Sequence, residues 1–146
     1  MVDNIYGQHS RNIDAKNRVM LPTKIRDILG NNFFLTIGME GIVELRSKAD
    51  FQNLIDVFNA QSFFDPKARM LKRFWLGNSQ EIELDSQNRF VIPKNILEKA
   101  AIQKEVLFIG VGNLVEMWSK EAYENYETKI SDEELLEAAQ TLIDKM

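Results

Sequence analysis

The sequence carries one motif twice, and this repeat constrains the fold more than any other feature. Residues 13–29 match a second stretch at a constant offset of 71, and after one inserted residue near Gly30 the match resumes at an offset of 72. The repeated residues are Asp14, Asn17, Arg18, Pro22, Ile25, Gly38, Val43, Glu44, Ser47 and Lys48 in the first copy and Asp85, Asn88, Arg89, Pro93, Ile96, Gly110, Val115, Glu116, Ser119 and Lys120 in the second. Solenoids need about three or more shorter repeats. Two copies therefore predict a pseudo-twofold pair that presents one chemical surface twice.

Length and composition limit the class of protein. A chain of 146 residues can bury one core or two small intertwined cores, but not several independent domains. It has no cysteine, which excludes a disulfide framework, a thiolate nucleophile and a cysteine metal site. Residues 1–4 lack the basic and apolar regions of a secretory signal, and the longest uncharged run, residues 28–39, is too short to span a bilayer. We therefore expect a cytoplasmic protein that does not contact a membrane.

Charge is distributed unevenly along the chain. The formal net charge is −4, and residues 131–146 supply all of it, with five acids against Lys145. Residues 1–75 carry 11 bases and 8 acids, a balance of +3. A DNA-binding surface needs a local cluster of Lys and Arg more than a basic total. The net charge therefore neither supports nor excludes a nucleic-acid partner.

Local patterns predict the same order of elements in both copies. Apolar runs at residues 19–21 and 90–92 each lead into a proline, which cannot donate to a central strand ladder. A short helical pattern follows each proline. Further strands are predicted at residues 33–37, 42–45, 106–109 and 114–118. The sequence therefore predicts an α+β fold in which each copy contains β-turn-β, a short helix and a second β-turn-β.

Longer helices are predicted from their N-cap residues, and they suggest the limits of the units. These helices begin at Ser47, Asp65, Ser119 and Ser131, the last of them in a capping box. The helix after Asp65 is basic and amphipathic, a pattern more typical of a packed helix than of a nucleic-acid surface. We expect a first unit at residues 5–60, a connecting basic helix at 61–80, a second unit at 81–128 and an acidic helix at 129–146.

The repeated segment between the first two strands is the candidate site. Its pattern, Asp-x-x-Asn-Arg, predicts a hairpin turn, because Asp bonds to backbone groups two residues on and Asn tolerates the left-handed conformation. An Asp four residues before the Arg can hold the guanidinium in a bidentate pair and leave its outer edge for a phosphate or a guanine. The sequence therefore predicts that Arg18 and Arg89 contact DNA, each oriented by its acid, Asp14 or Asp85.

Neighbouring residues extend this site and distinguish its two copies. Lys16 and Arg11 are expected to contact phosphates, which positions a protein on DNA without reading the sequence. Gln87 replaces Lys16 in the second copy, so the first copy is expected to bind the DNA backbone more strongly. An Asp–Arg pair across a turn is often only a surface ion pair worth about 0–1 kcal/mol. The duplication favours a functional role, because turn chemistry alone does not require an Arg in both copies.

The paired Asp-x-x-x-Arg elements, each leading into an apolar strand and a proline, resemble those of the MraZ family. Its members are bacterial transcription regulators built from two tandem AbrB-like units. Further matches are Ala68-Arg69, Arg73 and the run from Val111 to Ser119, and the resemblance extends from Ile5 to about Tyr126. It implies a pseudo-twofold swapped-hairpin β-barrel with flanking helices, a ring of identical subunits, and binding to short DNA repeats in promoters.

The resemblance also assigns the DNA contacts to two segments. The family's DNA-contacting motif corresponds to Asp14 through Arg18 and to Asp85 through Arg89. The family usually has glycine at the position of Asn17 and Asn88 in this chain. Asn is the next-best residue for a positive φ, so we expect the turns to form in spite of this difference.

These observations predict a non-enzymatic, sequence-specific DNA-binding regulator that is associated with the nucleoid and forms a homo-oligomer, with double-stranded DNA and itself as partners. His9 is the only histidine and lacks the partners of a nucleophile or a zinc site, and the glycines form no nucleotide-binding motif. No catalytic residue, cofactor, metal or small-molecule substrate is therefore predicted. Two alternatives remain open. One is a protein–protein adapter or antitoxin-like inhibitory scaffold with an AbrB-like fold, and the other is an enzyme of unknown type.

Overall fold

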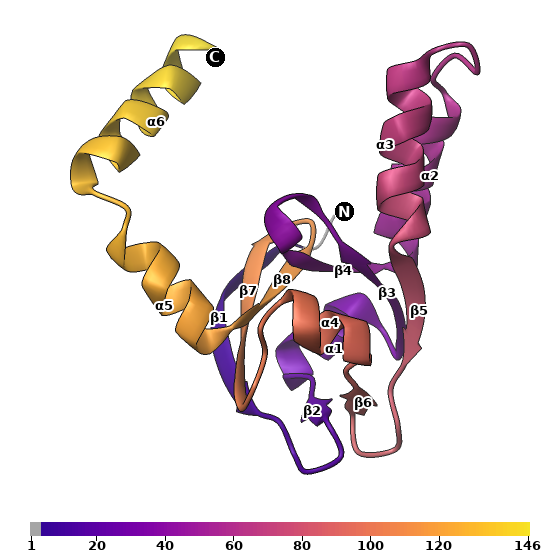
Figure 1. The fold of residues 1–146 in the computed structure, drawn as a ribbon, viewed down its shortest axis with the longest axis vertical. Helices are drawn as coiled ribbons and strands as arrows, with labels where there is room; N and C mark the ends of the chain where they lie inside the picture. The colour runs from indigo at the N-terminus through magenta and orange to yellow at the C-terminus, as the bar shows by residue number, and fades with distance from the viewer. Residues whose placement is uncertain (1–3) are drawn as a thin grey trace.

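A computed structural model describes residues 4–146 and contains the same order of elements twice, ββαββαα (Figure 1). The first repeat contains β1 (Ile5–Asn12), β2 (Arg18–Met20), α1 (Thr23–Leu29), β3 (Asn32–Ile37), the 3-10 turn η1 (Met39–Gly41), β4 (Val43–Ser47), α2 (Lys48–Asn59) and α3 (Pro66–Gly77). The second contains β5 (Ser79–Glu83), β6 (Arg89–Val91), α4 (Lys94–Lys99), β7 (Glu105–Gly112), β8 (Val115–Ser119), α5 (Lys120–Thr128) and α6 (Asp132–Asp144). The predicted α+β class and the predicted order of elements are confirmed.

The strands form two antiparallel sheets that join the repeats. The larger sheet has the order β1-β7-β8-β4-β3-β5, and β2 pairs with β6 in a separate two-stranded ribbon. The ladders β1·β7, β3·β5, β4·β8 and β2·β6 each link a strand of one repeat to a strand of the other. Within the part of the chain that the structure describes, only β3·β4 and β7·β8 pair strands of the same repeat. The two repeats are therefore a single folded body rather than two separate ones.

The predicted hairpins of β1 with β2 and of β5 with β6 are wrong, although their turns form. Each turn fixes only the reversal of the chain, and burial of apolar side chains decides which strands pair. Val19 of β2 and Phe90 of β6 are opposite each other in the ribbon and are both buried. The predicted closed barrel is not confirmed, because the larger sheet formed by residues 4–146 is open, with β1 and β5 at its edges.

Both repeats contribute equivalent residues to one hydrophobic core. Val19, Leu21 and Ile25 of the first repeat and Phe90, Ile92 and Ile96 of the second are each at most 3% exposed. Phe33 of the larger sheet packs edge to face on Phe90 of the ribbon, with ring centroids 5.5 Å apart. This shared core holds the ribbon and the short helices α1 and α4 against the larger sheet.

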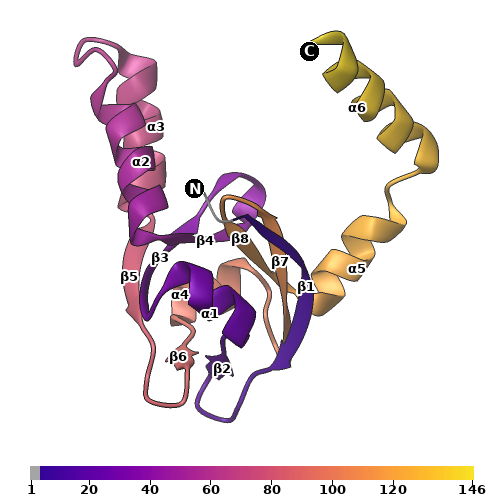
Figure 2. The ribbon, with the colours of Figure 1, turned by 180° about the vertical axis from the view of Figure 1, so that it is seen from behind.

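Two helical arms extend from the body at the end opposite the two turns (Figures 1 and 2). One arm is the α2–α3 hairpin and the other is α5 followed by α6. The predicted N-caps are confirmed, because the side chains of Ser47, Asp65, Ser119 and Ser131 each accept a backbone hydrogen bond at the start of their helix. Every helix within residues 4–146 is too short or too polar to cross a lipid bilayer.

Candidate nucleic-acid interface

The first turn orients Arg18 through one carboxylate. Asp14 Oδ1 accepts hydrogen bonds from the backbone N–H groups of Lys16 and Arg18, both at 2.9 Å. Asp14 Oδ2 accepts a third bond from Arg18 Nε at 2.7 Å. The expected bidentate pair between the two side chains is therefore not formed, since one oxygen binds the backbone and only Nε binds the other. The terminal Nη atoms of Arg18 have no hydrogen-bond partner among residues 4–146 and can donate to a ligand.

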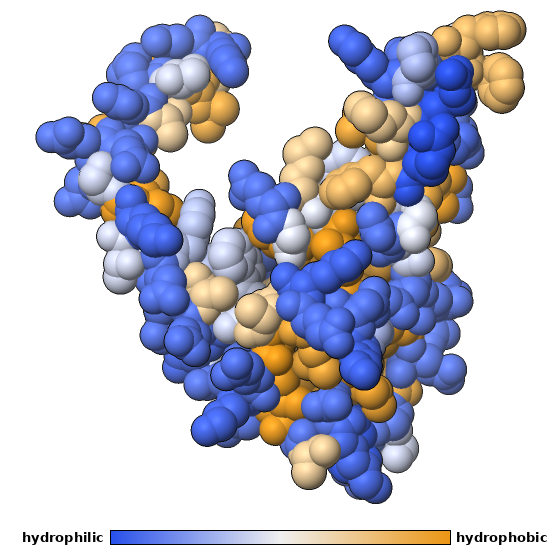
Figure 3. All heavy atoms as spheres, viewed as in Figure 1, coloured by the Kyte–Doolittle hydropathy of each residue, from blue (hydrophilic) through white to orange (hydrophobic). Residues whose placement is uncertain are grey.

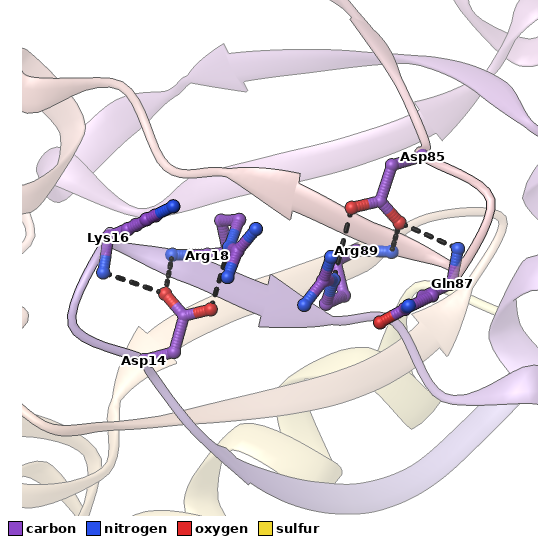
Figure 4. Close-up of polar contacts among 6 residues, drawn as sticks. All are labelled: Asp14, Lys16, Arg18, Asp85, Gln87 and Arg89. Carbon is purple, nitrogen blue, oxygen red and sulfur yellow. Dashed lines mark hydrogen bonds and ion pairs between the residues drawn. The ribbon is translucent and has the colours of Figure 1, made fainter.

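The second turn reproduces this geometry (Figure 4). Asp85 Oδ1 accepts from the backbone N–H groups of Gln87 at 2.8 Å and Arg89 at 2.9 Å. Asp85 Oδ2 accepts from Arg89 Nε at 3.0 Å. The repeat therefore preserves a complete hydrogen-bond pattern, in which one acid both closes the turn and orients the guanidinium.

Hydrogen bonding lowers the pKa of both acids. The backbone N–H of Arg18 is the main cause that lowers the pKa of Asp14, and partial desolvation opposes it. The backbone N–H of Arg89 lowers the pKa of Asp85 in the same way. Because both pKa values lie below the ordinary carboxyl value, each Asp–Arg pair is fully formed at neutral pH and is lost only as the pH falls through the lowered pKa.

Asn17 and Asn88 connect the two turns to each other. Each adopts a positive φ, 60° for Asn17 and 62° for Asn88, as predicted for this position. Their carbonyl groups accept hydrogen bonds from the opposite repeat, Asn17 O from Ile92 N at 2.8 Å and Asn88 O from Leu21 N at 2.9 Å. The turns are therefore fixed relative to each other as well as internally.

The β2·β6 ribbon places both arginines on one outer face. Arg18 is opposite Val91 and Met20 is opposite Arg89, while Val19 and Phe90 between them point into the core. Diagonal neighbours of this kind have Cα atoms about 7–8 Å apart. Met20 is 49% exposed and Val91 is 58% exposed, so two guanidinium groups and two apolar side chains share an accessible face.

The remaining predicted residues lie at different distances from this face. Lys16 and Gln87 are exposed at the tips of the two turns (Figure 4). Arg11 lies on the edge strand β1, where its Nη1 donates to the carbonyl of Ser10 at 2.7 Å. No hydrogen bond or ion pair among the described residues joins Arg11 to the ribbon. The structure therefore brings eight of the nine predicted residues together and leaves Arg11 outside the group.

Three residues of this region were not predicted from the sequence. Met20 and Val91 were assigned only to apolar strands, but the ribbon exposes them beside the arginines. Arg26 of α1 donates from Nη1 to the Asn88 side chain at 3.1 Å, across 62 residues of sequence. Its counterpart at the offset of 71 is Leu97. This break in the repeat is the signal that could have drawn attention to Arg26.

Comparison with known proteins identifies relatives along nearly the whole chain. The sequence model of the family described as "MraZ protein, putative antitoxin-like" matches residues 5–74 and residues 75–146. The chain is 42% identical over 131 residues to the transcriptional regulator MraZ of Mycoplasmopsis pulmonis, covering 90% of this chain and 89% of that protein. It is 40% identical over 135 residues to the same regulator of Thermoanaerobacter sp. (strain X514), covering 91% and 94%.

A third relative is the transcriptional regulator MraZ of Mycoplasma mobile, with 37% identity over 130 residues and 89% of each chain covered. Each match of the family model contains one ββαββαα repeat almost in full. These relatives are named as transcriptional regulators and not as enzymes. The chain therefore belongs to the MraZ family of transcriptional regulators.

Proposed function

We propose that this protein regulates transcription by binding specific DNA sequences with the outer face of the β2·β6 ribbon. The observation that carries the proposal is the pair of arginines on this face, each held by its own acid with its Nη atoms unpaired within the described residues. An Arg side chain fixed in this way loses little conformational entropy when it binds. Its two outer nitrogens match the O6 and N7 acceptors of guanine.

The shape of the ribbon supports the same function. The major groove of B-DNA is about 12 Å wide and admits a two-stranded β-ribbon. Met20 and Val91 lie beside the arginines and can contact thymine methyl groups, while Lys16 at the tip of the first turn can reach a phosphate. The face thus combines groups suited to reading bases with a group suited to positioning the duplex.

A single copy offers few contacts for binding at cellular salt, since each phosphate contact contributes about 0.9 to the slope of log affinity against log salt. We therefore propose a homo-oligomer, a ring of identical subunits that binds repeated short sites with avidity. The cross-repeat ladders support a pseudo-twofold swapped-hairpin body in each subunit. The proposal includes a division of the chain into a first unit at residues 5–60, a connecting helix at 61–80, a second unit at 81–128 and a C-terminal helix at 129–146. It also includes a cytoplasmic, nucleoid-associated location.

A second candidate function is an antitoxin-like adapter that binds another protein. The printed description of the matching family, "putative antitoxin-like", and the fully exposed amphipathic helix α6 favour it. Capture of one defined protein partner by purified protein free of nucleic acid, with no duplex enriched from random sequences, distinguishes the adapter from the DNA-binding regulator.

The proposal is tested by selecting duplexes from a random pool with the wild-type protein and measuring how variants bind the enriched sequence. Arg18→Ala is expected to abolish specific binding, because a bidentate contact to guanine is worth about 1–3 kcal/mol, or roughly 5- to 150-fold in affinity for each bound subunit. Arg18→Lys keeps the charge but loses the planar fork, so it is expected to lose most of the specificity as well.

Lys129→Ala is the matched control, because it removes one positive charge at the end of α5, on an arm far from the ribbon. It is expected to bind the selected duplex like the wild type. Native mass and thermal unfolding of all three variants should equal those of the wild type. Wild-type binding by Arg18→Ala contradicts the assignment of the ribbon as the DNA-contacting face.

A further inference from the structure

Helix α6 has no buried residue against the rest of residues 4–146. All of its residues, 132–144, are exposed, although it has an apolar side (Figure 3). The large side chains on that side, Leu135, Leu136, Leu142 and Ile143, are 57–69% exposed. Isolated helices of about 12–15 residues are only marginally stable in water, and an apolar stripe on a surface helix normally faces a core. Helix α6 therefore has the composition of a helix with a binding partner.

The counterpart of α6 in the first repeat shows what such a helix does when it is packed. Helix α3 occupies the same place in the ββαββαα order, and it folds back on α2. The rings of Trp75 on α3 and Phe58 on α2 have centroids 6.1 Å apart. In the second repeat, α6 instead extends away from the body, as both views in Figures 1 and 2 show. Leu71 and Trp75 of α3 are partly buried, whereas the apolar side chains of α6 are all exposed.

The outer surface of the α2–α3 hairpin is complementary to α6. Helix α3 carries four basic residues and no acid, namely Lys67, Arg69, Lys72 and Arg73, whereas α6 carries five acids and no base. Met70 and Phe74, one helical turn apart on α3, are 57% and 37% exposed. Phe63 and Phe64 at the tip of the hairpin are 78% and 84% exposed, and Phe63 lies beside Ala68, Arg69 and Lys72. Arg69 Nη1 fixes the tip by donating to the carbonyl of Phe63 at 2.7 Å.

We propose that α6 of one copy docks on α3 of the next copy, so that subunits join head to tail. The apolar stripe of α6 covers Met70 and Phe74, and the opposite charges of the two helices steer and orient the encounter. Each subunit gives its α6 to one neighbour and receives α6 from another on its α3. This one-way contact is heterologous and continues from subunit to subunit until it closes. The occupant is a second copy, because the two arms extend from opposite sides of one body and leave α3 and α6 apart (Figures 1 and 2).

This inference rests on the homo-oligomer of the proposed function and assigns its interface. It also gives a role to the acidic helix α6, which takes no part in the proposed contact between the ribbon and DNA. Ribbon and arms lie at opposite ends of the body (Figure 1). An assembly joined through the arms therefore leaves every ribbon free for DNA.

Cross-linking between single-cysteine variants tests the contact, since the natural chain contains no cysteine. Met70→Cys and Ala139→Cys, carried on full-length chains with tags of different size, are mixed and treated with a short flexible bismaleimide that tolerates a shift of register. The expected product is the mixed adduct between the two chains. Thr141→Cys, on the polar side of α6, is the matched control and should give several-fold less adduct with Met70→Cys.

A second measurement does not depend on register. Leu136→Glu places a charge in the apolar stripe of α6, and burial of one leucine contributes enough to shift association by at least about tenfold. The variant is expected to fall from the oligomeric mass to the monomer mass by analytical ultracentrifugation. Its strand signal in circular dichroism should equal that of the wild type, because α6 makes no part of the core. Thr141→Glu on the polar side should retain the wild-type mass.

Three results overturn the proposal. These are a wild type that is monomeric, a Leu136→Glu variant with unchanged oligomeric mass, and Ala139→Cys chains that link only to each other. The last result indicates α6 pairing with α6. Failure here is distinguishable from failure of the proposed function, because Arg18→Ala changes DNA binding at constant mass, whereas Leu136→Glu changes mass in a subunit with an intact ribbon.

Discussion

The two turns share every hydrogen bond between acid and arginine but differ in their surroundings. The first turn carries Lys16 at its tip, and the second carries Gln87 at the same place. The Asn88 side chain is held by Arg26 of α1, whereas at the equivalent place beside Asn17 the helix α4 has Leu97. An open groove lined by Asn17, Val91 and Leu97 lies on that side.

The difference separates two properties of the site. Orientation of the guanidinium comes from Asp, the turn backbone and the positive φ of Asn, and both repeats retain it. Charge at the tip and support of the Asn side chain vary between the repeats. The orientation of the arginines and the strength of the surrounding contacts can therefore be changed independently, and substitutions that exchange residues between the repeats test this.

The largest expected effect concerns the paired glycines Gly38 and Gly110, which have different neighbours. A Cβ on Gly110 would lie against the β1 backbone, with the carbonyl carbon of Ile5 only 2.6 Å away and Tyr6 N nearer still. A Cβ on Gly38 would instead meet the carboxylate of Glu44 at 2.8 Å, the end of a flexible side chain. Gly110→Ala is expected to destabilise the fold by about 1–3 kcal/mol, because β1 must move away from β7.

Gly38→Ala is the matched comparison, with an expected loss below about 1 kcal/mol because the Glu44 side chain can rotate. Urea unfolding of both variants measures the difference in the free energy of unfolding. Equal losses contradict the close approach of β1 to β7, which form the longest of the ladders between the repeats.

The next effect is on the salt dependence of DNA binding. Lys16→Gln makes the tip of the first turn like that of the second, and Gln87→Lys does the reverse. If Lys16 contacts a phosphate, its loss lowers the slope of log affinity against log salt by about 0.9 for each bound subunit. Gln87→Lys should raise the slope by a similar amount if the second tip lies equally close to the backbone.

Titrations of the selected duplex at several salt concentrations give these slopes. The double variant Lys16→Gln with Gln87→Lys is the control, because it keeps the total charge and should return the slope to near the wild-type value. Unchanged slopes in both single variants indicate that neither tip contacts a DNA phosphate. This conclusion does not depend on whether Arg18 and Arg89 contact the bases.

Much of the local structure could be predicted from the sequence. The prolines that end β2 and β6, the N-caps of the longer helices and the positive φ of Asn17 and Asn88 each depend on a residue and its immediate neighbours. The duplication also predicted a pseudo-twofold pair. These signals are short in range, and the sequence shows them directly.

Pairing between strands could not be predicted in the same way. The turn at Asp14 has the composition of a hairpin, but the choice of partner for β2 depends on Val19 meeting Phe90 in a core built by both repeats. Exposure of Met20 and Val91 depends on the same pairing. Arg26 joins the site only because α1 and the second turn meet in space. Such contacts require the three-dimensional arrangement, since nothing near residue 26 in sequence points to residue 88.

The smallest expected effect isolates that contact. Glycine replaces asparagine readily at a positive φ, so Asn17→Gly should change the free energy of unfolding by only a few tenths of a kcal/mol and leave the turn intact. Asn88→Gly also removes the acceptor of Arg26 Nη1, a partly buried hydrogen bond worth about 0.5–1.5 kcal/mol. The second substitution is therefore expected to cost more than the first, although the two turns have the same backbone.

A double-mutant cycle assigns this difference to one pair of side chains. In an Arg26→Leu background, which gives α1 the residue that α4 has at Leu97, Asn88→Gly should cost no more than Asn17→Gly in thermal unfolding. A difference that persists without Arg26 shows that the second turn is strained by its own backbone surroundings. The asymmetry between the repeats would then lie in the ribbon, and α1 would contribute only packing.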